Sequence, residues 1–127
     1  MNWELQDFLM DTSHRMIYHI TTKPEWIQAR LVQVYMADSL NTQGFIHCST
    51  REQILGTANA YFKGKKDLVI LCIESDRVQA PIKYEHPEGD PRLFPHIYGP
   101  LNLKAVLYEV DFPSENDGSF KLPRDLD

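Results

Sequence analysis

The chain has 127 residues, 43% of them hydrophobic and 24% charged, and a formal net charge of −5. This length suits a single domain whose core is large enough to fold without a metal or a disulfide. Its 13 Lys and Arg residues are scattered, which argues against generic nucleic-acid binding but leaves room for a small anionic ligand. No apolar run reaches the ~20 residues of a membrane span and no signal-peptide pattern is present, so we expect a soluble, cytoplasmic protein.

Residues 1–15 are predicted to be an N-terminal extension, either a short amphipathic helix or disordered, and residues 16–127 to form one domain. The first strand is predicted over Met16–Thr21, which is rich in β-branched and aromatic residues. Thr22 and Glu25 have the spacing of a capping box, so a helix should begin there and run to about residue 34.

The middle of the chain predicts a second strand and helix. Residues 38–42 are expected to be a loop, and Gly44–Ser49 a short strand after a glycine turn. Ser49 and Glu52 have the spacing of another capping box, which predicts a helix that ends near Phe62.

The second half is predicted to be mainly strands. Leu68–Ile73 is a continuous apolar run typical of a central strand, and Ile82–Glu85 and Ala105–Phe112 are further strands. Residues 86–92 are expected to be a loop, and Phe94–Leu101, interrupted by prolines near both ends, a shaped loop or edge turn. The order of elements indicates the α+β class, with two main helices packed on a mostly antiparallel sheet.

Two of the predicted strands each carry a histidine with a hydroxyl residue two positions on. His19 and Thr21 share one face of the first strand, and His47 and Ser49 share one face of the second. Each strand leads directly into a helix N-terminus, whose free N–H groups favour anions. If the two strands lie side by side, they form a polar cleft suited to a phosphate.

Other interpretations of these histidines remain open. A histidine in a strand is more often a hydrogen-bonded structural residue than part of a site. Together with His96, His19 and His47 have the number of ligands of a catalytic zinc site, although their spacings of 28 and 49 residues match no local metal motif. The sequence has no dinucleotide-binding fingerprint, P-loop or nucleophile elbow.

A bacterial family, catalogued as domain of unknown function 952, closely resembles nearly all of residues 16–123. The resemblance lies in four segments: MIYHITTKPEW, GFIHCSTREQ, FPHIYGPLNLKAV and DGSF followed, after one residue, by Leu-Pro. The family is in turn similar to the ADP-ribosyltransferase fold, a split, strongly bent sheet that binds NAD in its cleft. Within that superfamily, the nearest pattern is that of the RNA 2′-phosphotransferases.

This resemblance implies roles for individual residues. Tyr18–Thr21 is similar to the superfamily context "YHGT", with Ile20 in place of the glycine, and His47–Ser49 is similar to "HLS". His19 would then hydrogen-bond a ribose hydroxyl of NAD, and His47 would contact the nicotinamide side or the transferred phosphate. No residue stands out as the glutamate that most ADP-ribosyltransferases use, and FPHIYG supplies His96 instead.

An imidazole suits an anionic group or general acid–base chemistry, so transfer to protein by the usual mechanism is disfavoured. We therefore expect a nucleotide-binding domain, an NAD-dependent transferase or hydrolase that acts at a ribose or phosphate. Its expected catalytic residues are His19, His47 and His96, and its expected cofactor-binding residues are His19, Thr21, Ser49 and Tyr98. The alternatives are a non-catalytic nucleotide-binding module and a metal-dependent hydrolase that uses the three histidines, so whether the protein is an enzyme stays open.

Overall fold

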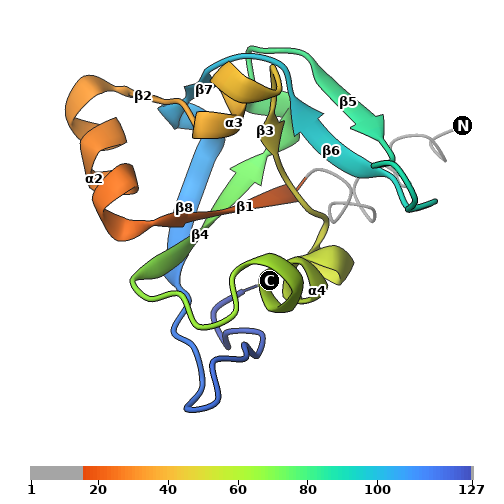
Figure 1. Ribbon diagram of the computed structural model, residues 1–127. Helices are drawn as coiled ribbons and strands as arrows, with labels where there is room; N and C mark the ends of the chain where they lie inside the picture. The colour runs from red at the N-terminus through yellow and green to blue at the C-terminus, as the bar shows by residue number, and fades with distance from the viewer. Residues whose placement is uncertain (1–15, 127) are drawn as a thin grey trace, which may run out of the picture.

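The computed structural model describes residues 16–126 (Figure 1), so the predicted N-terminal extension lies outside the described residues. Its α-helices and strands are β1 (Met16–Thr22), α2 (Lys23–Val32), β2 (Val34–Tyr35), α3 (Asp38–Thr42), β3 (Ile46–His47), α4 (Arg51–Tyr61), β4 (Leu68–Glu74), β5 (Ile82–Glu85), β6 (Phe94–Ile97), β7 (Leu101–Asn102) and β8 (Val106–Asp111). The strands pair antiparallel, which confirms the α+β class with a mostly antiparallel sheet. Among residues 16–126, no helix has the length and apolar character needed to span a membrane.

The strands are divided among three small sheets. Their orders are β1-β4-β8, β3-β6-β5 and the short pair β2-β7. The two three-stranded sheets are joined where Tyr18 of β1 forms an antiparallel bridge with Ser49, two residues after β3. In Figure 1, α2 and α4 lie on different sides of the long strands β1 and β4.

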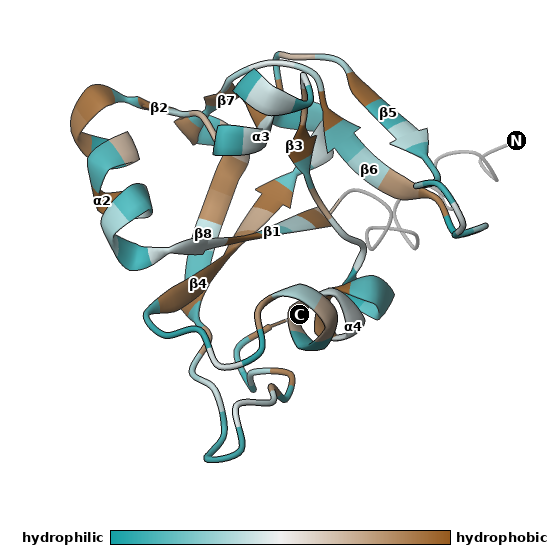
Figure 2. Ribbon diagram, in the orientation of Figure 1, coloured by the Kyte–Doolittle hydropathy of each residue, from teal (hydrophilic) through white to brown (hydrophobic). Residues whose placement is uncertain are grey.

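The core consists of two apolar clusters, one on each face of β1 and β4. Ile17 and Leu71 belong to the cluster that includes Trp26 and Ala29 of α2. The alternate strand residues belong to the other cluster, with Ile54 and Ala58 of α4: Tyr18, Ile20, Ile70 and Cys72. Both faces of β4 are therefore buried, which explains its continuous apolar run and its brown colour in Figure 2.

The first predicted helix start is confirmed and the second is wrong by one residue. Thr22 and Glu25 form the expected capping box at the start of α2. At α4 the box is formed by Thr50 and Gln53, not by Ser49 and its predicted partner. Ser49 is unavailable as a cap because its backbone N–H and C=O both bond to Tyr18, each at 2.8 Å.

Three other predicted boundaries are corrected. The expected loop 38–42 is the short helix α3. The first helix ends at Val32 because Gln33 adopts a left-handed φ of 69° and the chain turns into β2. The expected loop at 94–97 is β6, the middle strand of its sheet. Pro95 is tolerated in β6 because it lies where the β3–β6 ladder ends. The Pro95 C=O accepts from the N–H of Cys48, one residue beyond β3, and the N–H that proline lacks would point to the same place.

We expect Leu71→Ala to lower the free energy of unfolding by about 3–5 kcal/mol, because Leu71 is fully buried and its truncation leaves a cavity. Leu31→Ala makes the same chemical change at a side chain that is 74% exposed, and should shift stability by no more than about 0.5 kcal/mol. Urea unfolding of the two variants measures the difference. Similar losses in both would contradict the assigned core.

Candidate functional site

The β3–β6 pairing places His47 directly opposite His96. The neighbouring pair is hydrogen-bonded, from the Cys48 N–H to the Pro95 C=O at 3.0 Å. His47 and His96 therefore form a non-hydrogen-bonded pair, the arrangement that brings side chains of antiparallel strands closest together. Their ring centroids are 5.4 Å apart and the rings are nearly perpendicular.

His19 reaches this pair from β1. Its Nδ1 lies 2.5 Å from the backbone oxygen of His47, and its Nε2 lies 2.7 Å from the hydroxyl of Tyr35. A carbonyl only accepts, so Nδ1 carries the proton and donates it to His47, while Nε2 accepts from Tyr35. Burial lowers the pKa of His19 to about 4, so the ring is neutral at pH 7 with both nitrogens in use.

His96 is held by a carboxylate. Its Nδ1–H donates to Oε1 of Glu85 at 2.8 Å, and the hydroxyl of Tyr98 donates to the same oxygen at 2.6 Å. The hydrogen bonds from Tyr98 and then from His96 hold the pKa of Glu85 below its usual value, so the carboxyl stays ionised. The bond to Glu85 fixes one tautomer of His96 and leaves the lone pair on its Nε2.

His47 is exposed and is oriented by an amide. Its Nε2–H donates to Oε1 of Gln43 at 2.6 Å, which leaves the lone pair on Nδ1. Partial burial, and then the charge of His96, lower the pKa of His47, which favours the neutral ring at pH 7. Phe45 stacks on His96 with centroids 4.0 Å apart and contacts the His47 ring edge-on at 4.8 Å. The two imidazoles are thus fixed in relation to each other.

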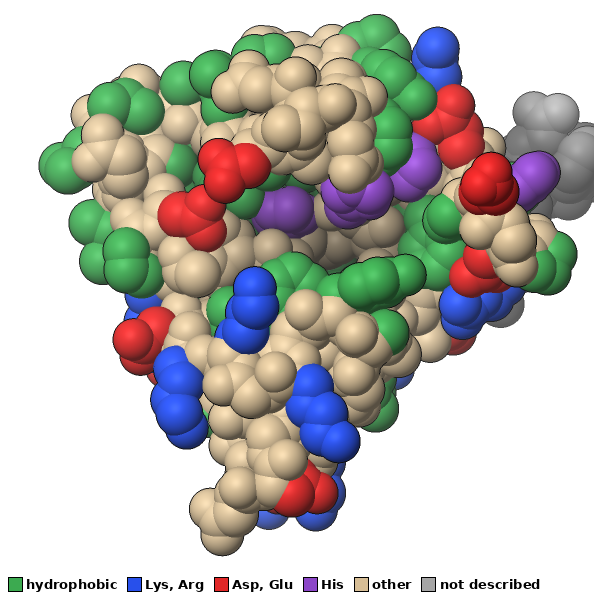
Figure 3. Space-filling view, in the orientation of Figure 1, with side chains coloured by type: hydrophobic (Ala, Val, Ile, Leu, Met, Phe, Trp, Pro, Cys, Tyr) green, Lys and Arg blue, Asp and Glu red, His purple; other side chains and the backbone are tan. Residues whose placement is uncertain are grey.

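These side chains border an open hollow. In Figure 3, histidine side chains gather along a depression between the part of the surface formed by α3 and β3 and the part formed by α4. Among the described residues, Nδ1 of His47 and Nε2 of His96 have no hydrogen-bond partner. These two nitrogens are the ones that remain for a ligand or a proton.

The structure treats the other predicted site residues differently. Tyr98 joins the site through Glu85. Thr21 is buried and donates to Glu25 at 3.2 Å, and the hydroxyl of Ser49 is 3.1 Å from that of Thr57. The hydroxyls of Thr21 and Ser49 therefore already bond within the protein, Ser49 toward α4.

Sequence reasoning did not pair Glu85 with His96, because the chain between them is rich in turn residues. In the structure the two belong to one hairpin, in which Lys83 pairs with His96. Glu85, two residues along from Lys83, is the diagonal neighbour of His96 on the same face. Recognition of residues 82–97 as a hairpin would have revealed the pair.

The three-histidine zinc arrangement is not formed. Across residues 16–126 there is no group of three His, Cys, Asp or Glu side chains that could hold a metal ion. The reason is visible at His19, whose two ring nitrogens are both bonded to protein atoms.

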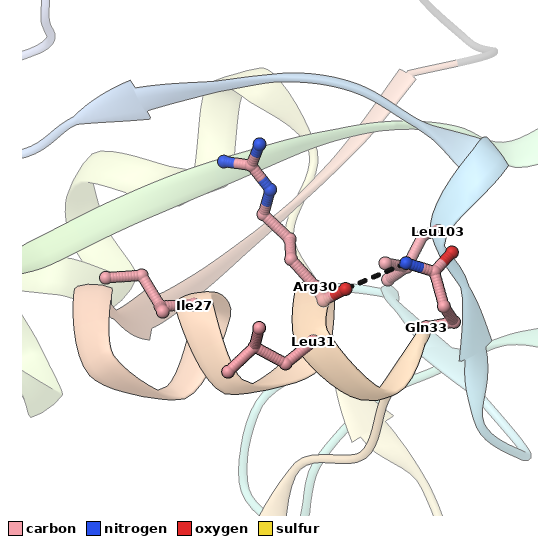
Figure 4. A pocket seen from close by; sticks show the side chains of 5 residues that line it. All are labelled: Ile27, Arg30, Leu31, Gln33 and Leu103. Carbon is pink, nitrogen blue, oxygen red and sulfur yellow. Dashed lines mark hydrogen bonds between the residues drawn. The ribbon is translucent and has the colours of Figure 1, made fainter.

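A second depression lies on the outer side of α2, with a volume of about 450 Å³ (Figure 4). It is lined by Ile27, Arg30, Leu31, Gln33 and Leu103. The amide of Gln33 donates to the Arg30 C=O at 2.8 Å, the dashed line in Figure 4. The lining holds no histidine or carboxylate, so this depression lacks the acid–base groups that border the histidine-lined hollow.

The family described as protein of unknown function (DUF952) matches residues 20–109. The chain belongs to the DUF952 family. No protein with a curated description matches it.

Structures of the protein CC0527 from Caulobacter crescentus are similar to this DUF952 chain. A crystal structure is 33% identical over 84% of this chain and 94% of that one, with a TM-score of 0.77. A solution NMR structure is 34% identical over 88% of this chain and 97% of that one, with a TM-score of 0.75. The match establishes the shared fold.

The burial of neutral His19 predicts a pH-dependent stability. The unfolded chain binds a proton at His19 near its ordinary pKa of 6.5, whereas the folded protein does so only near 4. The neutral His19 therefore contributes to the free energy of unfolding. This contribution is fully present above pH 6.5 and is lost as the pH falls toward 4, to a total of about 3 kcal/mol. Denaturant unfolding of the wild type and of His19→Asn across this range measures the effect, because Asn does not titrate.

His86→Asn is the control, since His86 lies in an exposed loop. Its stability should follow the wild-type pH dependence, whereas that of His19→Asn should be flatter. Parallel curves for the wild type and His19→Asn would contradict the buried neutral state of His19.

Proposed function

We propose that the histidine-lined hollow binds a nucleotide or a related phosphorylated small molecule, and that His47 and His96 act as an acid–base pair at its ribose or phosphate. One observation carries this proposal. The two imidazoles lie 5.4 Å apart, each with one ring nitrogen held by a polar side chain and the other unbonded. Such an arrangement presents two oriented imidazole nitrogens to one ligand.

The electrostatics support different roles for the two rings. Neutral His47 offers a lone pair on Nδ1 that accepts a proton from water or a hydroxyl. The Nδ1–H of His96 is bonded to the ionised carboxylate of Glu85, so Nε2 is the His96 nitrogen that carries the proton given to a leaving oxygen. His47 gains one proton and His96 loses one, so the number of protons on the pair is unchanged by the reaction.

NAD is the specific ligand implied by the ADP-ribosyltransferase resemblance, and it remains a proposal. The His47–His96 pair fits a phosphorylated ligand of this class. The ribose contact implied for His19 does not fit, because both of its ring nitrogens already bond to His47 and Tyr35. NAD is therefore one ligand to be tested among several.

A non-catalytic nucleotide-binding module is the second candidate. It is favoured by the position of Glu85, whose Oε1 accepts hydrogen bonds from both His96 and Tyr98. A carboxylate committed in this way is not presented to a developing ribosyl cation. This candidate predicts ligand binding without turnover.

The test is a thermal-shift titration with NAD, ADP-ribose, nucleoside monophosphates and inorganic phosphate. A ligand at 100 times its Kd should stabilise the protein by about 2.7 kcal/mol. The variant His96→Asn keeps a donor for Glu85 but removes Nε2, so it should bind at least tenfold more weakly, whereas His86→Asn in the exposed loop should bind like the wild type. Absence of any shift in the wild type would overturn the proposal.

Turnover of any ligand that binds separates the two candidates. If His47 acts as the base and His96 as the acid, removal of either ring should reduce the rate by about 10²–10⁴-fold. We expect His47→Asn and His96→Asn to show this loss when products are followed by ³¹P NMR. Binding with no product in the wild type would favour the non-catalytic module.

A further inference from the structure

The junction between β1 and β3 is unusual because its backbone ladder stops after one bridge. Tyr18 and Ser49 exchange both backbone hydrogen bonds at 2.8 Å. In this antiparallel register, the next pair would place Ile20 opposite His47. The backbone oxygen of His47 instead receives the Nδ1–H of His19, so a side chain takes the place of the next ladder bond.

The donor side chain is itself held from behind. Tyr35, which is 3% exposed, donates its hydroxyl to Nε2 of His19 at 2.7 Å. Burial raises the pKa of Tyr35, so the phenol stays protonated and remains a donor. Its strand β2 pairs with β7, where Tyr35 lies opposite Leu101, and its ring packs near Trp26. Tyr35, His19 and His47 therefore form a continuous hydrogen-bonded relay.

β3 needs such a support on this side. It has only two residues, and the β6 ladder holds its other edge. The backbone oxygen of His47 points toward β1, and the His47 side chain lies beside His96 of β6. The hydrogen bond from His19 to that oxygen therefore helps to fix the position of the His47 ring.

From this arrangement we infer that His19 and Tyr35 are positioning residues, which hold His47 against His96 and make no contact with the ligand. The inference rests on the proposed function, since it assigns the ligand to the His47–His96 pair. It differs from the role that the ADP-ribosyltransferase resemblance implies, in which His19 binds a ribose hydroxyl. The difference follows from the two occupied nitrogens of the His19 ring.

The experiment compares His19→Asn with His19→Leu. The Asn amide can still donate to the His47 oxygen, whereas Leu has a similar volume and no donor. Two readouts are measured on ¹⁵N-labelled protein: the imidazole resonances of His47, and the Kd for inorganic phosphate. We expect His19→Asn to keep both near wild type, with Kd within about twofold, and His19→Leu to move the His47 resonances and weaken phosphate binding about tenfold.

Tyr35→Phe is the second variant, in case His19→Leu does not fold. It removes only the hydroxyl, so the His19 resonances should shift and the Kd for phosphate should rise by a smaller factor, about threefold. Equal weakening of phosphate binding in His19→Asn and His19→Leu, with His47 resonances unchanged, would assign His19 to direct contact and overturn the inference.

Failure of the proposed function gives a different pattern. If the wild type does not bind phosphate, or binds it with the same Kd as His96→Asn, the proposed ligand site at His47 and His96 is wrong. The His47 resonances still decide the positioning role, because they need no ligand. A shift of the His47 resonances in His19→Leu but not in His19→Asn supports the positioning role, and no shift in either variant overturns it.

Discussion

The backbone pairing of Tyr18 with Ser49 is the interaction on which the rest of the site depends. It joins the two three-stranded sheets and fixes which way the backbone of β3 faces. With Ser49 bonded toward β1, period-two alternation turns the His47 carbonyl toward β1 as well. The same pairing takes Ser49 away from the helix cap, so that Thr50 is the N-cap of α4.

A second constraint is the satisfaction of polar groups at the partly buried end of this junction. The His47 oxygen receives a side-chain donor from His19, and the His19 ring in turn receives a donor from Tyr35. On the other side of His47, Glu85 and Gln43 each orient one of the paired rings. These bonds distinguish the three histidines. Both ring nitrogens of His19 are bonded to protein groups, whereas His47 and His96 each have one ring nitrogen without a hydrogen-bond partner among the described residues.

Much of the fold could be predicted from local sequence. The β-branched first strand, the Thr22 capping box and the apolar run of β4 were all recognisable because each signal lies within a few neighbouring residues. Two of the errors, at Ser49 and Pro95, occurred where tertiary pairing decides. Ser49 has the residue type of a cap and Pro95 that of a loop, yet Ser49 pairs with Tyr18 and the Pro95 C=O accepts from Cys48, both far along the chain.

The sequence by itself determined the class of fold and the short list of candidate histidines, because periodicity, capping spacing and residue type are local properties. Only the tertiary structure decided what each histidine does. The partners that distinguish them are 28 residues away for His19 and His47, 16 for His19 and Tyr35, and 11 for Glu85 and His96. An imidazole acts as donor, acceptor or base according to which groups face its two nitrogens, and for His19 and His96 those groups come from segments that the tertiary structure brings together.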